Sequence, residues 1–144
     1  MRISSKGEYA LKAVLELSKN YGKDIVTIAD LSRTTKTPKK FLEHILIDLK
    51  KGGFVESRRG SVGGYSLTKS PGRIKLGDVI EAIEGPIRSG KNSAGKKPQG
   101  TVEKVFDRIW NEVAESTLDI LGGITFEDLL SRIRTHNEAI DYVI

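Results

Sequence analysis

The chain has 144 residues, a formal net charge of +5, 38% hydrophobic and 30% charged residues, which is typical of one soluble domain with or without a small appendage. It has no cysteine and two histidines, which excludes disulfides, thiolate nucleophiles and cysteine-ligated iron–sulfur clusters, and we expect neither a metal nor a cofactor. No run reaches the ~20 apolar residues of a membrane span, and no signal-like segment opens the chain. We therefore expect a cytoplasmic protein.

Positive charge is concentrated in the middle of the chain. Residues 33–69 hold nine Lys/Arg against three Asp/Glu, and residues 86–100 add four Lys/Arg with no acidic residue. Residues 101–144 are acidic, with four Lys/Arg against nine Asp/Glu. A localised basic stretch is typical of a protein with a polyanionic partner, although a merely solvated basic face has the same composition.

The N-terminal third predicts two helices. Ser5-x-x-Glu8 is a capping box, and apolar residues then recur at helical spacing up to a stop at residues 20–22. Thr27-x-x-Asp30 is a second box that opens a short helix over 28–34. Residues 35–37 follow as a tight connection.

A third helix is expected over 38–51. Thr37 is suited to its N-cap and Pro38 to its first helical position, where a fixed φ and a missing N–H do no harm. Gly52-Gly53 ends it. The apolar residues of this helix predict one buried stripe: Phe41, Leu42, Ile45, Leu46 and Leu49.

The periodicity then changes from 3.6 to 2, which predicts two short strands, 54–58 and 65–68. The intervening glycines at 60, 63 and 64 have neither the spacing nor the following helix of a phosphate-binding loop. The segment is therefore predicted to be a hairpin with a basic tip.

The C-terminal part is predicted to be helical. A helix over 76–84 leads into a Gly/Pro/Ser/Lys-rich loop at 86–100, a long helix follows over 101–121, and Thr125-x-x-Asp128 opens a last one that ends near Arg134. The predicted fold is mainly α with a small β-hairpin (α+β). We expect a winged helix-turn-helix domain at 1–85, a flexible basic loop at 86–100 and a helical dimerisation or effector region at 101–144.

The helix, short turn, helix and hairpin occur in the order of a winged helix-turn-helix, in which the second helix enters the major groove. Lysines suit phosphates, Glu43 can accept a hydrogen bond from cytosine N4, and Arg58 and Arg59 can reach phosphate or a narrow minor groove. Glu43 and His44 have alternative explanations, as a partner of a nearby lysine and as an ordinary surface residue. The predicted DNA-binding residues are Thr37, Lys39, Lys40, Glu43, His44, Arg58, Arg59, Ser61 and Tyr65.

The helix at 101–121 has a broad apolar stripe opposite a charged face. Such a stripe is wider than a helix needs to cover a small domain, so we expect a dimer interface, with packing on the chain's own domain as the alternative. The predicted interface residues are Val102, Val105, Phe106, Ile109, Trp110 and Val113.

Four stretches together resemble the Rrf-two family of bacterial winged helix-turn-helix transcription regulators, which includes the IscR, NsrR and CymR types. They are KGEYAL at 6–11, FLEHIL at 41–46, the arginine-glycine hairpin of 53–67 and LGDVIEAIEG at 76–85. The resemblance covers residues 1 to about 87 closely and 101–134 in helix layout. It implies a homodimeric repressor that binds a partly palindromic operator in double-stranded DNA, with base reading by Glu43 and wing contacts by Arg59.

The sequence departs from this family at one important place. Iron–sulfur members have three cysteines between the Asp-Val-Ile helix and the long helix, where this chain has serine, lysine and glycine. It therefore resembles the cysteine-free CymR type. CymR represses sulfur-amino-acid genes together with a cysteine-synthesising enzyme, so the resemblance implies control of sulfur or cysteine metabolism with a metabolic enzyme as co-regulator.

Two other classes of function are alternatives to a DNA-binding regulator. A winged-helix adaptor whose main partner is another protein would also carry a basic face, and the salt dependence of DNA binding separates it from a regulator. No Ser/His/Asp set, cysteine nucleophile or carboxylate pair is recognisable, so we expect no catalytic residues and no enzyme activity.

Overall fold

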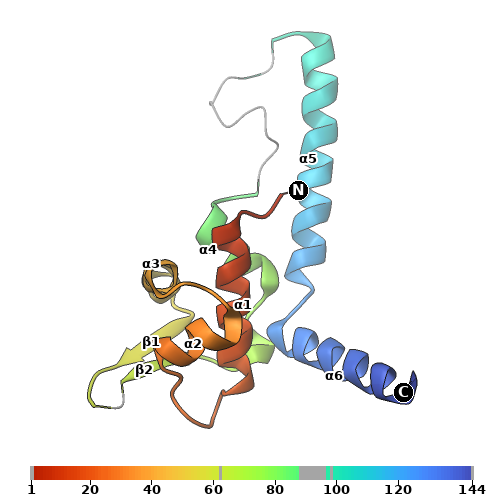
Figure 1. Cartoon of the computed structure of the whole chain (residues 1–144). Coiled ribbons are helices and arrows are strands. Elements are labelled where there is room, and N and C mark those ends of the chain that lie inside the picture. The colour runs from red at the N-terminus through yellow and green to blue at the C-terminus, as the bar shows by residue number, and fades with distance from the viewer. Residues whose placement is uncertain (1, 62, 88–96, 98, 144) are drawn as a thin grey trace.

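The computed structural model describes residues 2–61, 63–87, 97 and 99–143. Helices α2, α3, α4 and α6 and the hairpin contact α1, while Figure 1 shows that α5 extends away from this body. The mainly α fold with one antiparallel hairpin is confirmed. In chain order the elements are α1 Ser5–Lys19, α2 Ile28–Thr35, α3 Lys39–Lys51, β1 Val55–Arg58, β2 Gly64–Leu67, the 3-10 turn η1 Pro71–Arg73, α4 Leu76–Glu84, α5 Thr101–Gly122 and α6 Phe126–Val143.

Helix α1 begins with a cap on Ser4. The backbone of Ser4 is extended and its Oγ accepts a hydrogen bond from the Gly7 N–H at 3.1 Å. The predicted capping box at Ser5 and Glu8 is therefore wrong by one residue. The Ser4 N–H in turn donates to Glu84 at 3.0 Å, which joins the start of α1 to the end of α4.

The backbone conformation and local hydrogen bonds hold the connection between α2 and α3 in place. Lys36 adopts the left-handed conformation with φ 52°, and the Ser32 hydroxyl donates to the Thr37 carbonyl at 2.7 Å. The predicted N-cap role of Thr37 is wrong, because its side chain is 1% exposed and its hydroxyl donates to the Thr35 carbonyl. Pro38 occupies the cap position and has no side-chain donor or acceptor to offer the helix.

The hairpin pairs Val55 with Leu67 and Arg58 with Gly64. Val26 extends this sheet, since its backbone exchanges hydrogen bonds of 3.0 and 2.8 Å with Tyr65. A Cβ on Gly64 would lie 2.5 Å from the Val26 carbonyl oxygen, so this close approach requires glycine. The predicted strand at 54–58 starts one residue too early, and the predicted strand at 65–68 lies one residue too late at both ends, because pairing starts at Val55 and runs from Gly64 to Leu67 on the second strand.

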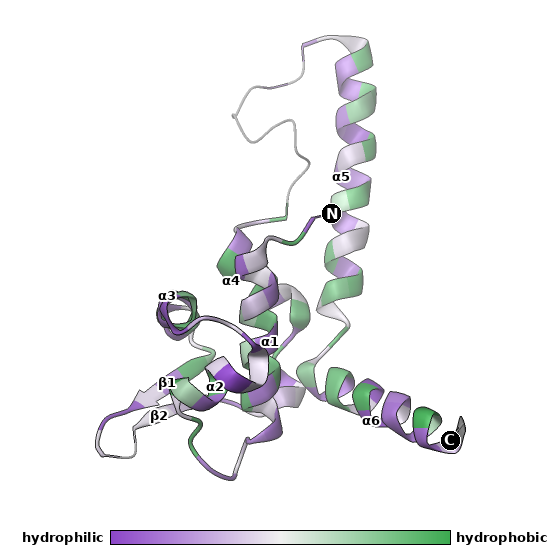
Figure 2. Ribbon diagram, viewed as in Figure 1, coloured by the Kyte–Doolittle hydropathy of each residue, from purple (hydrophilic) through white to green (hydrophobic). Residues whose placement is uncertain are grey.

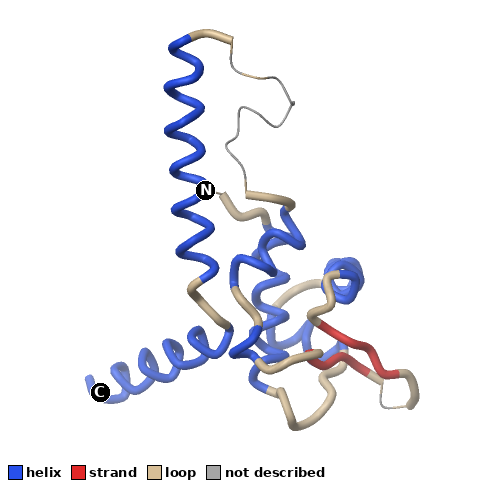
Figure 3. Tube along the Cα trace, turned by 180° about the vertical axis from the view of Figure 1, so that it is seen from behind, coloured by secondary structure: helices blue, strands red, loops and turns tan. Residues whose placement is uncertain are grey.

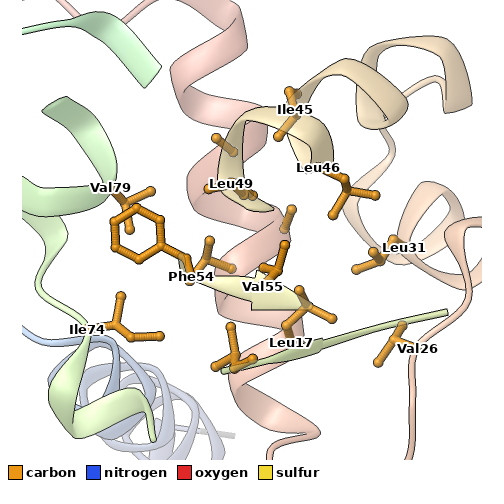
Figure 4. Close-up of a cluster of buried hydrophobic side chains, with 14 of the residues drawn as sticks. Leu17, Val26, Leu31, Ile45, Leu46, Leu49, Phe54, Val55, Ile74 and Val79 are labelled. Atoms are coloured by element: carbon orange, nitrogen blue, oxygen red, sulfur yellow. The ribbon is translucent and has the colours of Figure 1, made fainter. Parts of the chain in front are cut away.

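The core lies between α1, α3 and the hairpin, with contributions from α2, α4 and the start of α6. Figure 4 shows Leu17, Leu46, Leu49 and Val55 converging from three of these elements. Phe41 was predicted to belong to the buried stripe of α3, and this is wrong, because it is 58% exposed. It sits on the flank of the stripe, with its ring centroid 6.2 Å from that of Tyr9 in α1.

The start of α6 is tied to the segment before α4. The Leu76 N–H donates to the Ile124 carbonyl at 2.8 Å, and the Phe126 N–H donates to the Ile74 carbonyl at 3.1 Å. The capping box predicted at Thr125 and Asp128 is confirmed by reciprocal bonds of 2.9 and 3.1 Å. The predicted end near Arg134 is wrong, because the helix continues to Val143 through a segment without glycine or proline.

Helix α5 is anchored at one end. Leu121 is its buried residue and packs closely on Gly77 of α4, whereas the helix farther from this point extends away from the body, as Figures 1 and 3 show from opposite sides. Figure 2 shows hydrophobic and hydrophilic residues alternating around it. The predicted loop 86–100 lies largely outside the described residues.

Candidate nucleic-acid interface

The solvent side of α3 carries most of the predicted DNA-binding residues. Lys39, Lys40, Glu43 and His44 are all exposed, and their spacing puts them on the first two turns of the helix. The two lysines and His44 can donate hydrogen bonds, and Glu43 can accept them. This surface can therefore meet both phosphate oxygens and base edges.

Two exposed polar contacts link α3 to its neighbouring elements. The Lys50 ammonium donates to Ser57 Oγ at 2.8 Å and joins the helix to β1, while Lys6 pairs with Asp48 at 2.6 Å and joins it to α1. The hydrogen bond from Lys6 holds the pKa of the Asp48 carboxyl below its usual value. Asp48 is thus ionised at neutral pH, and Lys6 neutralises its charge beside the basic face.

The tip of the hairpin is basic and exposed. Arg58 ends β1, and Arg59 and Ser61 follow it on the exposed turn. Gly60 has φ 134°, and its carbonyl accepts from the Gly63 N–H at 3.1 Å, which closes the turn. Figure 1 shows the hairpin projecting beyond α2 and α3, so its tip is free to reach a partner of α3.

Two of the predicted DNA-binding residues lie elsewhere. Thr37 is buried and supports the turn from inside, so we remove it from the DNA-facing set. Tyr65 is half-buried against the core, and its backbone pairs with Val26. The structure therefore brings together two groups from the prediction, one on α3 and one at the hairpin tip.

Sequence reasoning missed two basic residues of this surface. Lys36 is exposed at the left-handed position of the turn, directly before α3. Lys51 is exposed in the last turn, eleven residues or about three helical turns after Lys40, and so lies on the same side. The spacing between Lys40 and Lys51 can be read from the sequence, so Lys51 could have been predicted as part of this surface.

The six predicted interface residues of α5 are exposed in the single chain. Their exposed fractions run from 40% for Trp110 to 63% for Val102. Phe106 and Trp110 stack with ring centroids 6.5 Å apart. A continuous apolar face of this kind is unusual on a monomeric soluble protein, so it indicates an interaction surface.

Comparisons with known proteins agree with this geometry. A family model described as "Rrf2: Iron-dependent Transcriptional regulator" matches residues 3–132. A chain of Rhodobacter capsulatus named as an rrf2-like HTH-type transcriptional regulator is 38% identical over 90% of this chain and 92% of its own length. The HTH-type transcriptional regulator CymR of Bacillus subtilis is 31% identical over the full length of both chains. The solved structure of CymR, the global cysteine regulator of B. subtilis, superposes with a TM-score of 0.77 and 30% identity, covering 92% of this chain and 98% of that one.

Proposed function

Because this chain belongs to the Rrf2 family and is a DNA-binding transcriptional regulator with a winged helix-turn-helix, we propose that it represses transcription as a homodimer bound to a partly palindromic operator. The observation that carries this proposal is the exposed basic face of α3 beside a basic hairpin tip. Both surfaces are held by the same small core, so they can engage one DNA segment together.

We assign different roles to the residues of this surface. Lys39, Lys40 and Arg58 contact phosphates, because a lysine or arginine at these exposed positions supplies sequence-independent attraction. Glu43 reads a base, because a carboxylate among phosphates is repelled unless it accepts a hydrogen bond from an exocyclic amine such as cytosine N4. His44, Arg59 and Ser61 complete the surface.

The homodimer forms through α5 in this proposal. The exposed apolar stripe of α5 needs a partner, and a second copy of the chain supplies an identical stripe across a two-fold axis. Such an axis sets two α3 helices about 34–36 Å apart, one turn of DNA, which matches a palindromic site.

The regulator acts without an iron–sulfur cluster. The family model is described as iron-dependent, but this chain has no cysteine and therefore lacks the thiolates that ligate such clusters. Within residues 2–61, 63–87, 97 and 99–143, no group of three or more His, Asp and Glu is arranged to hold a metal ion. The residues thus do not fit the cofactor that the family description implies.

The regulated process is proposed from the likeness to CymR. That relative is named as a global cysteine regulator and is similar to this chain over its full length. We therefore propose control of sulfur or cysteine metabolism, with a metabolic enzyme as co-regulator that contacts the region 101–144.

Selection of genomic fragments by the purified protein tests the function. We expect recovery of promoter fragments that share a two-fold-symmetric sequence, and an affinity that falls roughly 10³–10⁵-fold between 50 and 200 mM salt if about 6–10 phosphates are contacted. Lys40→Ala should flatten the salt slope by about one unit and weaken all DNA sequences alike. Recovery of random fragments, or affinity that ignores salt, would favour the protein-binding adaptor instead.

A further inference from the structure

A cavity of about 740 Å³ lies between α1 and α3, on the side of α3 that borders its DNA-facing residues. Its volume falls in the range of 300–1,000 Å³ that small-molecule sites occupy. The residues that line it come from two helices only: Ser5, Lys6 and Tyr9 of α1, and Phe41, His44, Ile45, Ile47, Asp48 and Lys51 of α3.

One part of this α1–α3 cavity is apolar and open. The rings of Tyr9 and Phe41 lie with centroids 6.2 Å apart at an interplanar angle of 44°. Phe41 and Ile47 are 58% and 51% exposed, so two large apolar side chains that line the cavity are open to solvent. An aromatic or branched aliphatic group fits such a surface.

The other part of the cavity is positively charged. Lys6 and Asp48 form an ion pair at 2.6 Å and neutralise one another. Lys51 is a second ammonium group of the lining, near enough to Asp48 to act on its carboxylate electrostatically, and His44 adds a further donor. With two lysines against one aspartate, the lining keeps one excess positive charge. The charge balance of the lining therefore favours an anion.

From these observations we propose that the α1–α3 cavity binds a small organic carboxylate with an aromatic or branched aliphatic body. Lys51 pairs with the carboxylate, and Phe41 and Ile47 contact the body. The cavity is lined by short stretches of two helices, which suits a small molecule. A docked helix would require an extended groove instead.

Occupation of the cavity has a consequence for DNA binding, which rests on the proposed function. A bound carboxylate brings negative charge next to His44 and neutralises Lys51, which lies about three helical turns from Lys40 on the same side of α3. Attraction to phosphate is thereby reduced, so the ligand acts as an inducer that weakens operator binding.

Binding is tested first on the full-length protein without DNA. Titration calorimetry and ¹H–¹⁵N NMR are carried out with 3-phenylpropionate and isovalerate, and with 3-phenylpropylamine and 3-phenylpropanol as cationic and neutral counterparts. We expect the carboxylates to bind with Kd of about 1 mM or tighter and to shift resonances of α1 and α3, with little response to the amine.

Two neighbouring lysines provide a matched pair of variants. Lys51→Gln should weaken carboxylate binding about tenfold, as expected for loss of one charge-assisted hydrogen bond, whereas Lys50→Gln, which removes a lysine bonded to Ser57 on the wing side, should leave it unchanged. Phe41→Ala should also weaken binding, and its exposed position makes loss of the fold unexpected. Adding 3-phenylpropionate should then weaken binding to a selected promoter fragment for the wild type but not for Lys51→Gln.

Three results would overturn the proposal. They are equal binding of carboxylate and amine, equal effects of the two lysine variants, and the absence of any shift of α1 and α3 resonances on addition of either carboxylate. Because the first measurements contain no DNA, failure of the cavity proposal is distinguishable from failure of the proposed operator binding.

Discussion

Replacing Ile109 and Val113 together with aspartate should convert the proposed dimer into a monomer. The two side chains are 43% and 53% exposed in the single chain. Full burial of such a side chain contributes about 1.5–3 kcal/mol, so covering its exposed half contributes about 1 kcal/mol. A two-fold interface contains four such side chains, and their loss amounts to about 4 kcal/mol, or roughly a thousandfold in Kd.

Burying unpaired carboxylates weakens association further. Sedimentation velocity at micromolar concentration should therefore show a dimer for the wild type and a monomer for the double variant. Trp110, the one tryptophan of the chain, flanks the stripe, and its fluorescence should shift to longer wavelength on dissociation. Operator binding should be lost although α3 and the hairpin are unchanged.

A control variant places two aspartates on the opposite face of α5, at Lys104 and Asn111, and should remain a dimer. A double variant that still sediments as a dimer, or a wild type that sediments as a monomer at micromolar concentration, would refute the reasoning. The first result would mean that the dimer interface lies outside this stripe. The second would mean that the stripe binds a partner other than a second copy of the chain.

The remaining predictions concern single residues of the DNA-binding region. Glu43→Ala should reduce discrimination at one base pair per half-site by about 1–3 kcal/mol, measured by competition among operator variants, and an unchanged ranking would make Glu43 an ordinary surface charge. Gly64→Ala should destabilise the fold by about 1–3 kcal/mol in urea, because its Cβ would lie 2.5 Å from the Val26 carbonyl oxygen, whereas Gly122→Ala, with no neighbour within 4 Å, should be neutral or stabilising. Asp48 has a lowered pKa in the folded chain, so its ion pair stabilises the protein above the ordinary value of 3.8 and is lost as pH falls through the folded-state pKa. The stability difference between wild type and Asp48→Asn should accordingly be less than about 1 kcal/mol near pH 7 and disappear at lower pH, and a difference that persists at pH 2 would contradict this cause.

Local signals in the sequence were sufficient for most helices. Helix α4 has the predicted bounds, and the capping residues Thr27 and Thr125 act as expected, because each side chain bonds to a backbone three residues away. The glycine-rich segment between the two strands was correctly predicted to be a hairpin turn and not a phosphate-binding loop. In all these cases the residues that determine the structure lie only a few positions apart in the sequence.

The errors come from contacts that sequence spacing does not report. Phe41 has the period of a buried residue, but whether α1 covers that flank depends on how the helices cross. Thr37 has the chemistry of an N-cap, but the left-handed Lys36 turns it inward. The end of α6 was placed too early because the apolar stripe fades after Arg134, although the backbone continues as a helix.

The packing of α5 on α4 at its C-terminal end makes this helix a lever. A helix of 22 residues is about 33 Å long, so a tilt of about 10° at the joint between Gly77 and Leu121 moves the far end by about 6 Å. If two such levers are clamped to one another, their joints set the span between the two α3 helices, which has to match one turn of DNA. The close packing of Leu121 on Gly77 would then be the pivot that determines which operator spacing the dimer can bind.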